Sequence, residues 1–239
     1  MPTAYQSPIK LHLCHSCNIN ISNPIFVKGT NKGAIYDPSS HIFVVTDRII
    51  LIMNSKKYQL DEYHFHNPGE HDVNGKIYDA EVHYVFSQLK PGEKHTPDDY
   101  KCRNVCNCND YDRDHDYSND THDRNILVIG RVISPSRHHE IPDLERAGDV
   151  FPKEAGERLN SVYECRRSLS DTPFLRLQVD TESNYYMYDG SLTTGSFAPV
   201  RWLVGDEPIY LNLDDIKKVS KIARPIQNID GRIILFSEC

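Results

Sequence analysis

The sequence has no apolar stretch of about 20 residues, which is the length that a helix needs to cross the hydrocarbon layer of a membrane. Its first residues, Met1–Gln6, lack the basic start and the apolar run of a secretory signal peptide. The apolar segment Ile233–Phe236, near the other end, is short enough to be a β-strand. We therefore expect no membrane span in this chain.

An excess of positive charge is also absent. Lys and Arg total 27 against 34 Asp and Glu, so the formal net charge is −7. Such a balance argues against nucleic acid as a partner, because a polyanion is attracted to basic surfaces. The 239 residues, of which 38% are hydrophobic and 26% charged, suit one large domain, residues 1–239, with a substantial core.

Paired cysteines are not evident. The chain has seven cysteines, and an odd number leaves at least one thiol unpaired or in an intermolecular bridge. Cys14 and Cys17 enclose His15 at a spacing typical of redox or metal sites, but no second pair stands at zinc-knuckle distance. Reduced thiols in a reducing compartment are the favoured interpretation.

One hairpin organises the sequence. Asn74-Gly75 is the strongest short signal for a two-residue type I′ turn. Folding the chain about this turn places His66 directly opposite His83. His64 and His66 are two residues apart, so both point to the same face of their strand. The sequence therefore predicts three imidazoles on one face of a sheet.

Three histidines without cysteine suit a catalytic zinc site, which keeps its fourth position for water. Two carboxylates flank them: Glu81 shares a face with His83, and Glu62 shares a face with His64. Each could accept the second ring N–H of its histidine and fix the tautomer. The alternative, ordinary half-buried strand histidines, explains a single histidine better than it explains three on one face.

These residues resemble a known family, the α-class carbonic anhydrases. The resemblance lies in His64-Phe65-His66, Glu70-His71, Glu81-Val82-His83 and the segment Tyr188–Thr194. Weaker similarities lie near the two ends, in Gln6–Ile9 and Arg224–Gln227.

The resemblance implies a fold and an activity. The expected fold is α+β but mainly β, a single domain on a large twisted, mostly antiparallel sheet with a few short helices. The expected activity is the zinc-dependent, reversible hydration of CO2 to bicarbonate and a proton, a lyase reaction, at a moderate rate. CO2 and bicarbonate would be the partners of the site, and Zn²⁺ its cofactor.

The resemblance also implies roles for individual residues. Thr193 would accept a hydrogen bond from the nucleophile and donate its own proton to Glu70, and Thr194 would help to hold bicarbonate. His41 is similar in position to the family's proton-shuttle histidine, although a surface strand histidine is an equally good interpretation. An apolar substrate pocket would be lined by Val85, Val128 and Leu192.

The chain departs from the family in two places. The family has two prolines after its Thr pair, whereas this chain has Gly195-Ser196, which predicts a looser pocket wall. An acidic, Cys- and Asp-rich insertion also runs from about residue 90 to 125. Its alternating Asp residues lack the Gly and the closing Glu of a calcium loop, so a solvated loop is favoured over a second metal site.

A second function therefore stays open, that of a binding protein on a carbonic-anhydrase-like scaffold with a cell-surface or receptor partner. The poxvirus cell-surface-binding proteins, which resemble carbonic anhydrases but lack the zinc ligands, have a similarly short N-terminal segment. Because the sequence shows neither a signal peptide nor a transmembrane segment, the expected location is cytoplasmic or virion-associated. A weaker third option is an esterase-like hydrolase that uses the same metal.

Patterns of apolar residues predict the main elements. Strands are expected at Ile42–Thr46, Ile49–Met53, Ile126–Ile133, Leu175–Val179 and Val200–Val204. The best helix candidate is Lys153–Arg167, where apolar residues repeat at helical spacing.

Overall fold

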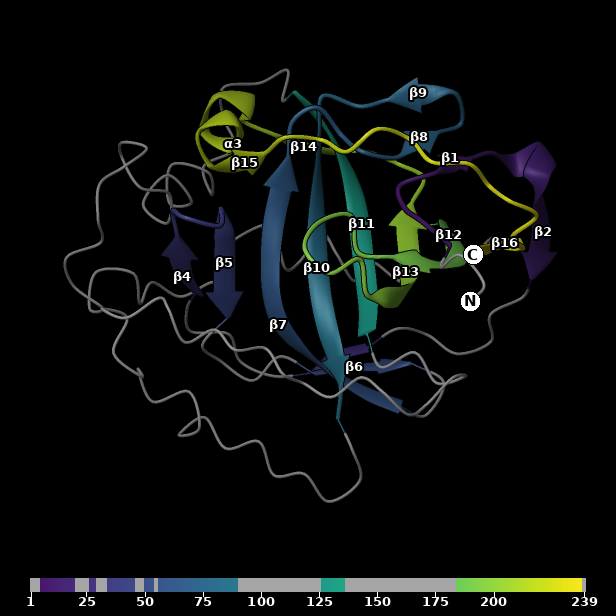
Figure 1. The fold of residues 1–239 in the computed structure, drawn as a ribbon, viewed down its shortest axis with the longest axis horizontal. Helices are drawn as coiled ribbons and strands as arrows, with labels where there is room; N and C mark the ends of the chain where they lie inside the picture. The colour runs from purple at the N-terminus through teal and green to yellow at the C-terminus, as the bar shows by residue number, and fades with distance from the viewer. Residues whose placement is uncertain are drawn as a thin grey trace.

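The computed structural model describes residues 5–19, 26–28, 34–45, 50–53, 56–89, 126–135 and 184–237. These parts of the chain are mainly β-structure (Figure 1). One α-helix, α3 (Leu213–Val219), and a short 3-10 helix, Leu13–His15, accompany the strands in them. The prediction of a mainly β fold is confirmed.

Within the described residues, thirteen strands form one large sheet, whose main path runs in the order β2-β16-β12-β13-β11-β10-β7-β5-β4. The strands of this path are β2 (Ser16–Ile19), β4 (Ala34–Asp37), β5 (Ile42–Val45), β7 (Lys56–His66), β10 (Ala80–Gln88), β11 (Ile126–Pro135), β12 (Tyr185–Ser191), β13 (Pro199–Gly205) and β16 (Ile234–Ser237). Beside the path lie β3 (Phe26–Lys28), β6 (Ile50–Met53), β14 (Ile209–Leu211) and β15 (Ser220–Lys221). A separate three-stranded sheet consists of β1 (Lys10–Leu11), β8 (Asp72–Val73) and β9 (Lys76–Ile77).

Most pairings in the large sheet are antiparallel, as predicted. The parallel exceptions are β11 with β13 and β14, β15 with β7, and β16 with β2. The predicted strands at residues 42–46, 49–53, 126–133 and 200–204 correspond to β5, β6, β11 and β13. The predicted helix Lys153–Arg167, the predicted strand Leu175–Val179 and the insertion at about 90–125 lie outside the described residues.

Strands β7, β10 and β11 are the centre of the sheet, and both of their faces are covered. Tyr63, Phe65 and Val82 point into one apolar cluster, whereas Val85 and Val128 belong to a second cluster on the other face. This arrangement follows from the side-chain period of two, which sends neighbouring residues of a strand to opposite faces. The histidines of β7 and β10 share the face of the second cluster, next to buried Trp202.

The register of β7 against β10 differs from the prediction by two residues. His83 lies opposite His64, and His66 lies opposite Glu81, so the expected His66–His83 pair is wrong. The turn itself is as predicted: Asn74 and Gly75 have φ values of 55° and 83°, and Val73 pairs with Lys76. That hairpin, however, is β8–β9 of the smaller sheet, so it does not set the register of β7 and β10. A shift of two keeps every side chain on its face, and the histidines still converge.

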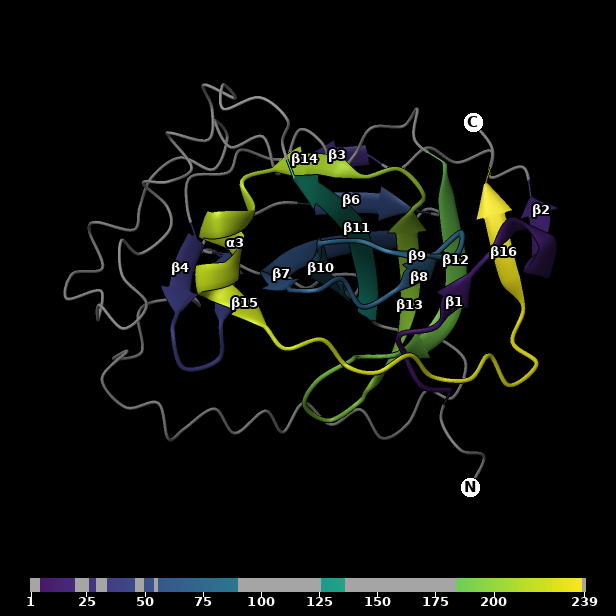
Figure 2. The same ribbon diagram turned by 90° about the horizontal axis from the view of Figure 1, so that it is seen from above.

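The segment between β15 and β16 runs beside the first described residues of the chain and is hydrogen-bonded to residues 6–8 (Figure 2). Arg224 donates to the carbonyl of Ser7 at 2.7 Å, and Arg232 donates to that of Gln6 at 2.6 Å. Gln227 N–H donates to the carbonyl of Pro8 at 2.7 Å.

None of the helices in the described part of the chain is long and apolar enough to cross a membrane.

Candidate metal centre

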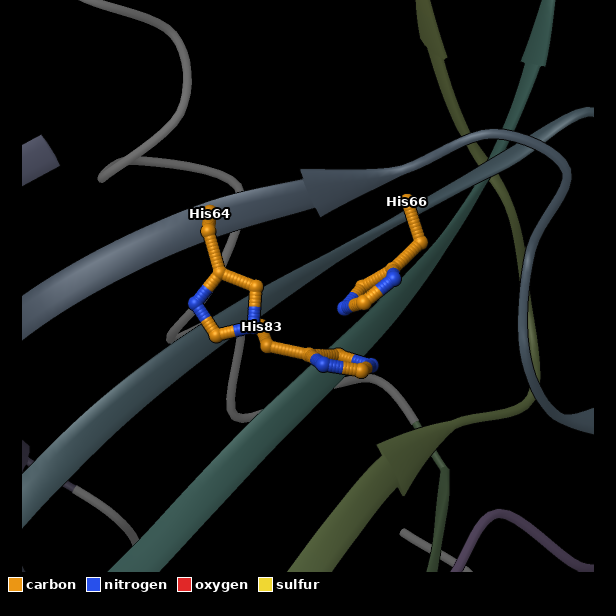
Figure 3. A group of neighbouring side chains, drawn as sticks. All are labelled: His64, His66 and His83. Carbon is orange, nitrogen blue, oxygen red and sulfur yellow. The ribbon is translucent and has the colours of Figure 1, made fainter. Parts of the chain in front are cut away.

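The three histidines come together from two neighbouring strands. His64 and His66 lie at the end of β7, His83 lies in β10, and their rings converge on one region (Figure 3). One ring nitrogen from each lies within 4.8 Å of the other two. The side chains are buried, with 4%, 0% and 1% of their surface exposed. This cluster is the expected three-imidazole site.

Glu81 fixes the orientation of His83. Its Oε1 lies 2.9 Å from His83 Nε2, which leaves Nδ1 of the same ring to face a metal. The other carboxylate oxygen accepts the backbone N–H groups of Glu70 at 2.8 Å and His71 at 2.9 Å. His71 also contacts Glu81 Oε1 through Nδ1 at 2.6 Å, and Nε2 of His71 lies 2.6 Å from the hydroxyl of Tyr188. His71 therefore links the carboxylate to strand β12.

Glu62 does not reproduce this arrangement. Its Oε1 lies 3.7 Å from His64 Nδ1, which is beyond the range of a hydrogen bond. Of the two carboxylates that we expected to bind a ring N–H, only Glu81 does so in the structure.

The charges around the cluster suit metal binding. Burial opposes ionisation of Glu81, but the neighbouring His71 and His83 rings, with their hydrogen bonds, outweigh it and hold its pKa well below the usual value. Burial and the neighbouring Lys221 lower the pKa of His64 well below its usual value, and burial with neighbouring His83 does the same for the pKa of His66. Both rings are therefore neutral near pH 7, which is the form that binds metal.

Glu70 lies against the same cluster. Its Oε1 accepts the backbone N–H of Arg224 at 2.7 Å, and the side chain is 1% exposed. Its Oε2 lies 3.9 Å from His83 Nδ1 and has no hydrogen-bond partner among the described residues. One oxygen of this buried carboxylate is thus held in place, and the other is available to a donor.

The Thr pair lies in the loop that joins β12 to β13. A hydrogen bond of 2.8 Å from Leu192 N–H to the carbonyl of Ala198 closes this loop. Thr193 is 4% exposed and Thr194 is half-buried. The partly buried Leu192 packs against the cluster that contains Val85 and Val128, and these two valines pair across β10 and β11.

His41 lies outside this group. It immediately precedes β5, has a left-handed φ of 53° and is partly buried. Strand β5 pairs with β7 at Phe43–Tyr63, so His41 stands beside the strand that carries His64 and His66.

Two contributors were not predicted from the sequence. A Cβ on Gly130 would lie 2.9 Å from Glu81 Oε1, so this glycine makes room for the carboxylate. A glycine within an apolar strand is the signal that could have indicated such a close approach. The backbone N–H of Arg224 holds Glu70 from 154 residues away, and no local pattern could reveal that contact.

The donor set fits a zinc ion. His66 Nε2 is a buried nitrogen without a hydrogen-bond partner among the described residues, and a metal would satisfy it. Three imidazoles without a thiolate are typical of catalytic zinc, whereas structural sites usually have four protein ligands. In the described part of the chain, His12, Cys14 and His15 form no comparable group, although His12 Nδ1 lies 3.1 Å from Cys14 Sγ.

Sequence comparison finds distant relatives. No family model matches the chain. Carbonic anhydrases of Pectobacterium carotovorum and Pectobacterium atrosepticum are each 24% identical, over 96% and 77% of this chain. A carbonic anhydrase of Nostoc sp. is 25% identical over 75% of it. The matches span 79%, 61% and 54% of the lengths of these three relatives.

Comparison with solved structures also finds carbonic anhydrases. The α-carbonic anhydrase of Thermovibrio ammonificans, in complex with the inhibitor sulfanilamide, has 23% identity and a TM-score of 0.63, over 97% of this chain and 86% of its own. The α-carbonic anhydrase of Photobacterium profundum has 22% identity and a TM-score of 0.65, and the match covers 98% of this chain and 90% of that one. Dioscorin complexed with ascorbate has 20% identity and a TM-score of 0.68, over 98% and 86%. The chain therefore has the fold of the α-carbonic anhydrases, and it is a distant sequence relative of proteins that carry the name carbonic anhydrase.

Proposed function

We propose that the protein is a zinc-dependent carbonic anhydrase that hydrates CO2 reversibly to bicarbonate and a proton. The observation that carries this proposal is the convergence of three buried histidines beside a glutamate with one carboxylate oxygen that has no hydrogen-bond partner among the described residues. His64, His66 and His83 would hold the ion. Zinc bound in this way lowers the pKa of a water ligand to about 7, which supplies a nucleophile at neutral pH.

The protein groups around the ion would orient the reaction. Thr193 would donate a hydrogen bond from its hydroxyl to Glu70 Oε2, which has no partner among the described residues, and its hydroxyl oxygen would accept a hydrogen bond from the attacking water. This chain of hydrogen bonds needs Glu70 to accept at Oε2, and the Arg224 N–H on Oε1 holds the carboxylate in place. The attack is thereby directed at CO2, which Val85, Val128 and Leu192 hold against an apolar wall, and Thr194 binds the product bicarbonate.

Each turnover also releases a proton that must reach the buffer. We assign this transfer to His41, because imidazole is the side chain that exchanges protons most readily near neutral pH. The hydroxyls of its neighbours Ser39 and Ser40 both donate hydrogen bonds to the Asp37 carboxylate, so they are not oriented to order a chain of water molecules beside His41. The expected enzyme is active but moderate in rate. Imidazole should accelerate turnover more in His41→Ala than in the parent, whereas equal rates at low buffer would remove His41 from the mechanism.

The decisive experiment measures zinc content and CO2 hydration on the same samples. The parent should contain one zinc per chain and be active. His83→Ala should lose zinc or most activity, because two imidazoles leave an incomplete site. His12→Ala is the matched control, since His12 is an exposed histidine outside the cluster. Full zinc content in the triple variant of His64, His66 and His83 would refute the ligand assignment.

A binding protein on the same scaffold is the second candidate. It is favoured by the similarity to dioscorin, whose structure is a complex with ascorbate, because the fold alone does not define an activity. Retention of the histidines together with Glu70 and Thr193 favours the enzyme. A zinc-loaded protein that shows no hydration at any buffer concentration would decide for the binding protein.

A further inference from the structure

The loop that carries Thr193 and Thr194 contains an unusual residue at its far end. Phe197 has a φ of 52°, in the left-handed region that bulky side chains rarely adopt. Gly195, with a φ of 69°, adopts the same region without strain, whereas a residue with a Cβ does so only when its surroundings hold it there. A specific contact of the Phe197 side chain is therefore expected.

That contact is with Arg224. The guanidinium carbon of Arg224 lies 4.3 Å from the centroid of the Phe197 ring, within the range of a cation–π interaction. The guanidinium is itself fixed, because it donates to the carbonyl of Ser7 at 2.7 Å and to Gln6 Oε1 at 2.8 Å. The ring of Phe197, which is 40% exposed, thus rests on a cation that cannot easily move.

Arg224 also connects the loop to Glu70. Its backbone N–H donates to Glu70 Oε1 at 2.7 Å, so one residue contacts both the glutamate and the end of the Thr loop. The start of the loop is fastened separately, because Ser191 and Ser7 exchange two hydrogen bonds of 3.2 Å. Thr193 and Thr194 therefore lie between two anchors, one at Ser191 and one at Phe197.

We propose that Phe197 is a positioning residue that holds the Thr193–Thr194 loop in register with Glu70 by stacking on the guanidinium of Arg224. The stack supplies the rigidity that Gly195-Ser196 does not. The catalytic consequence rests on the proposed carbonic anhydrase activity, whereas the anchoring of the loop does not.

Four variants separate the π face from simple bulk. Phe197→Ala removes the ring, Phe197→Leu keeps apolar bulk without a π face, and Phe197→Tyr keeps the stack. Tyr210→Ala is the control, because Tyr210 is an exposed aromatic residue of β14, 51% exposed. All of these positions are partly exposed, so the variants should fold, and thermal unfolding and zinc content check this.

The first measurement is amide hydrogen exchange of the Leu192–Ala198 segment in the metal-free protein. It reports on the closing hydrogen bond from Leu192 N–H to Ala198 and needs no activity. Exchange should be about 2- to 5-fold faster in Phe197→Ala and Phe197→Leu, as expected for the loss of an exposed cation–π contact. Phe197→Tyr and Tyr210→Ala should match the parent.

The second measurement is CO2 hydration at high buffer concentration, where proton release does not limit the rate. With zinc content unchanged, kcat and kcat/KM should fall together in the Ala and Leu variants, by about 2- to 5-fold. A parallel fall means that an interaction made in the transition state has been weakened, whereas a merely structural role would lower the zinc content or the melting temperature instead.

The outcomes are distinct. Parent-like exchange in Phe197→Ala would overturn the anchoring role. Parent-like behaviour of Phe197→Leu alone would overturn the assignment to guanidinium stacking, since apolar bulk would then suffice. An inactive zinc-loaded parent would refute the proposed function, and the exchange data would still decide whether Phe197 fixes the loop.

Discussion

Four hydrogen bonds converge on the carboxylate of Glu81. Two come from the backbone N–H groups of Glu70 and His71, and two join the rings of His71 and His83. Because the side chain is fully buried, each of these bonds forms without competition from water. The orientation of His83 therefore depends on a buried charge that four hydrogen bonds of the folded chain hold in place.

Glu81→Gln should weaken zinc binding by about 10- to 100-fold, the usual effect of losing the partner of a metal-binding histidine. The amide keeps the shape of the carboxylate but replaces one acceptor oxygen by a donor, which faces the N–H groups of the backbone or the rings. Competition with a chelator measures the affinity. Asp189→Asn, at a partly exposed carboxylate of β12 paired with Arg201, is the control and should bind zinc as the parent does.

Gly130→Ala should also weaken zinc binding, although Gly130, the cross-strand neighbour of His83, supplies no metal ligand itself. The new methyl group would lie 2.9 Å from Glu81 Oε1 and 3.4 Å from Val204, so the carboxylate must move. Overpacking of this kind destabilises a core by about 1–3 kcal/mol. Chemical denaturation and zinc titration together test this. A variant that loses stability but keeps the parent's zinc affinity would show that Glu81 adjusts without disturbing His83.

Residue identity and alternation were enough to predict the histidine face and the role of Glu81. They were not enough for Glu62, because a shared face does not fix a distance, and the observed 3.7 Å depends on how its side chain packs. Arg224 shows a second limit. Its N–H reaches Glu70 only through the tertiary fold, and a backbone group carries no residue-specific signal.

At the scale of elements, the sequence pattern identified the turn at Asn74-Gly75 but assigned it to the wrong pair of strands. The connection between β7 and β8 is longer than the connection between β9 and β10, and this inequality produces the difference of two residues in the register of β7 and β10. The turn closes the smaller sheet, where Asn74 N–H also donates to the carbonyl of Leu11. A local turn signal gives the local pairing, and the register of longer strands is set by their buried faces.

Replacing residues 94–123 with a short Gly-Ser linker should leave zinc binding intact. Strands β10 and β11 are antiparallel neighbours, and Ser87 pairs with Ile126, so the two ends of the insertion leave and return at adjacent points. A short loop can span that gap, and surface connections tolerate changes in length. Zinc content and thermal unfolding of the shortened chain provide the measurement. A folded variant without zinc would give the Cys- and Asp-rich segment a part in metal handling.

At the scale of the whole molecule, the buried histidines make the metal-free fold sensitive to acid. The pKa values of His64 and His66 are lowered in the folded state, mainly by burial, from an unfolded value of 6.5. Below about pH 6.5 the unfolded chain binds protons that the native rings do not, so stability falls as the pH falls. The lowered pKa of Glu81 adds a second loss below its unfolded value of 4.5.

The free energy of unfolding of the metal-free protein should therefore decline between pH 7.5 and 5.5, by at most about 1.4 kcal/mol per pH unit for each histidine. Urea denaturation at a series of pH values measures the slope. His64→Gln should reduce it, because one titrating ring is removed, whereas His12→Ala, at an exposed position, should not. A flat profile in the parent would mean that protonated rings are accommodated in the native state.

The attachment of residues 6–8 to residues 224–232 bears on when the protein becomes functional during its synthesis. On the ribosome, Gln6 and Ser7 emerge more than 200 residues before the arginines that hold them. Glu70 likewise accepts a hydrogen bond from the Arg224 N–H, so its carboxylate lacks this donor until Arg224 has been translated. Nascent chains that stop before Arg224 could pair β7 with β10 and gather the histidines, yet Glu70 would reach its observed position only after Arg224 has emerged.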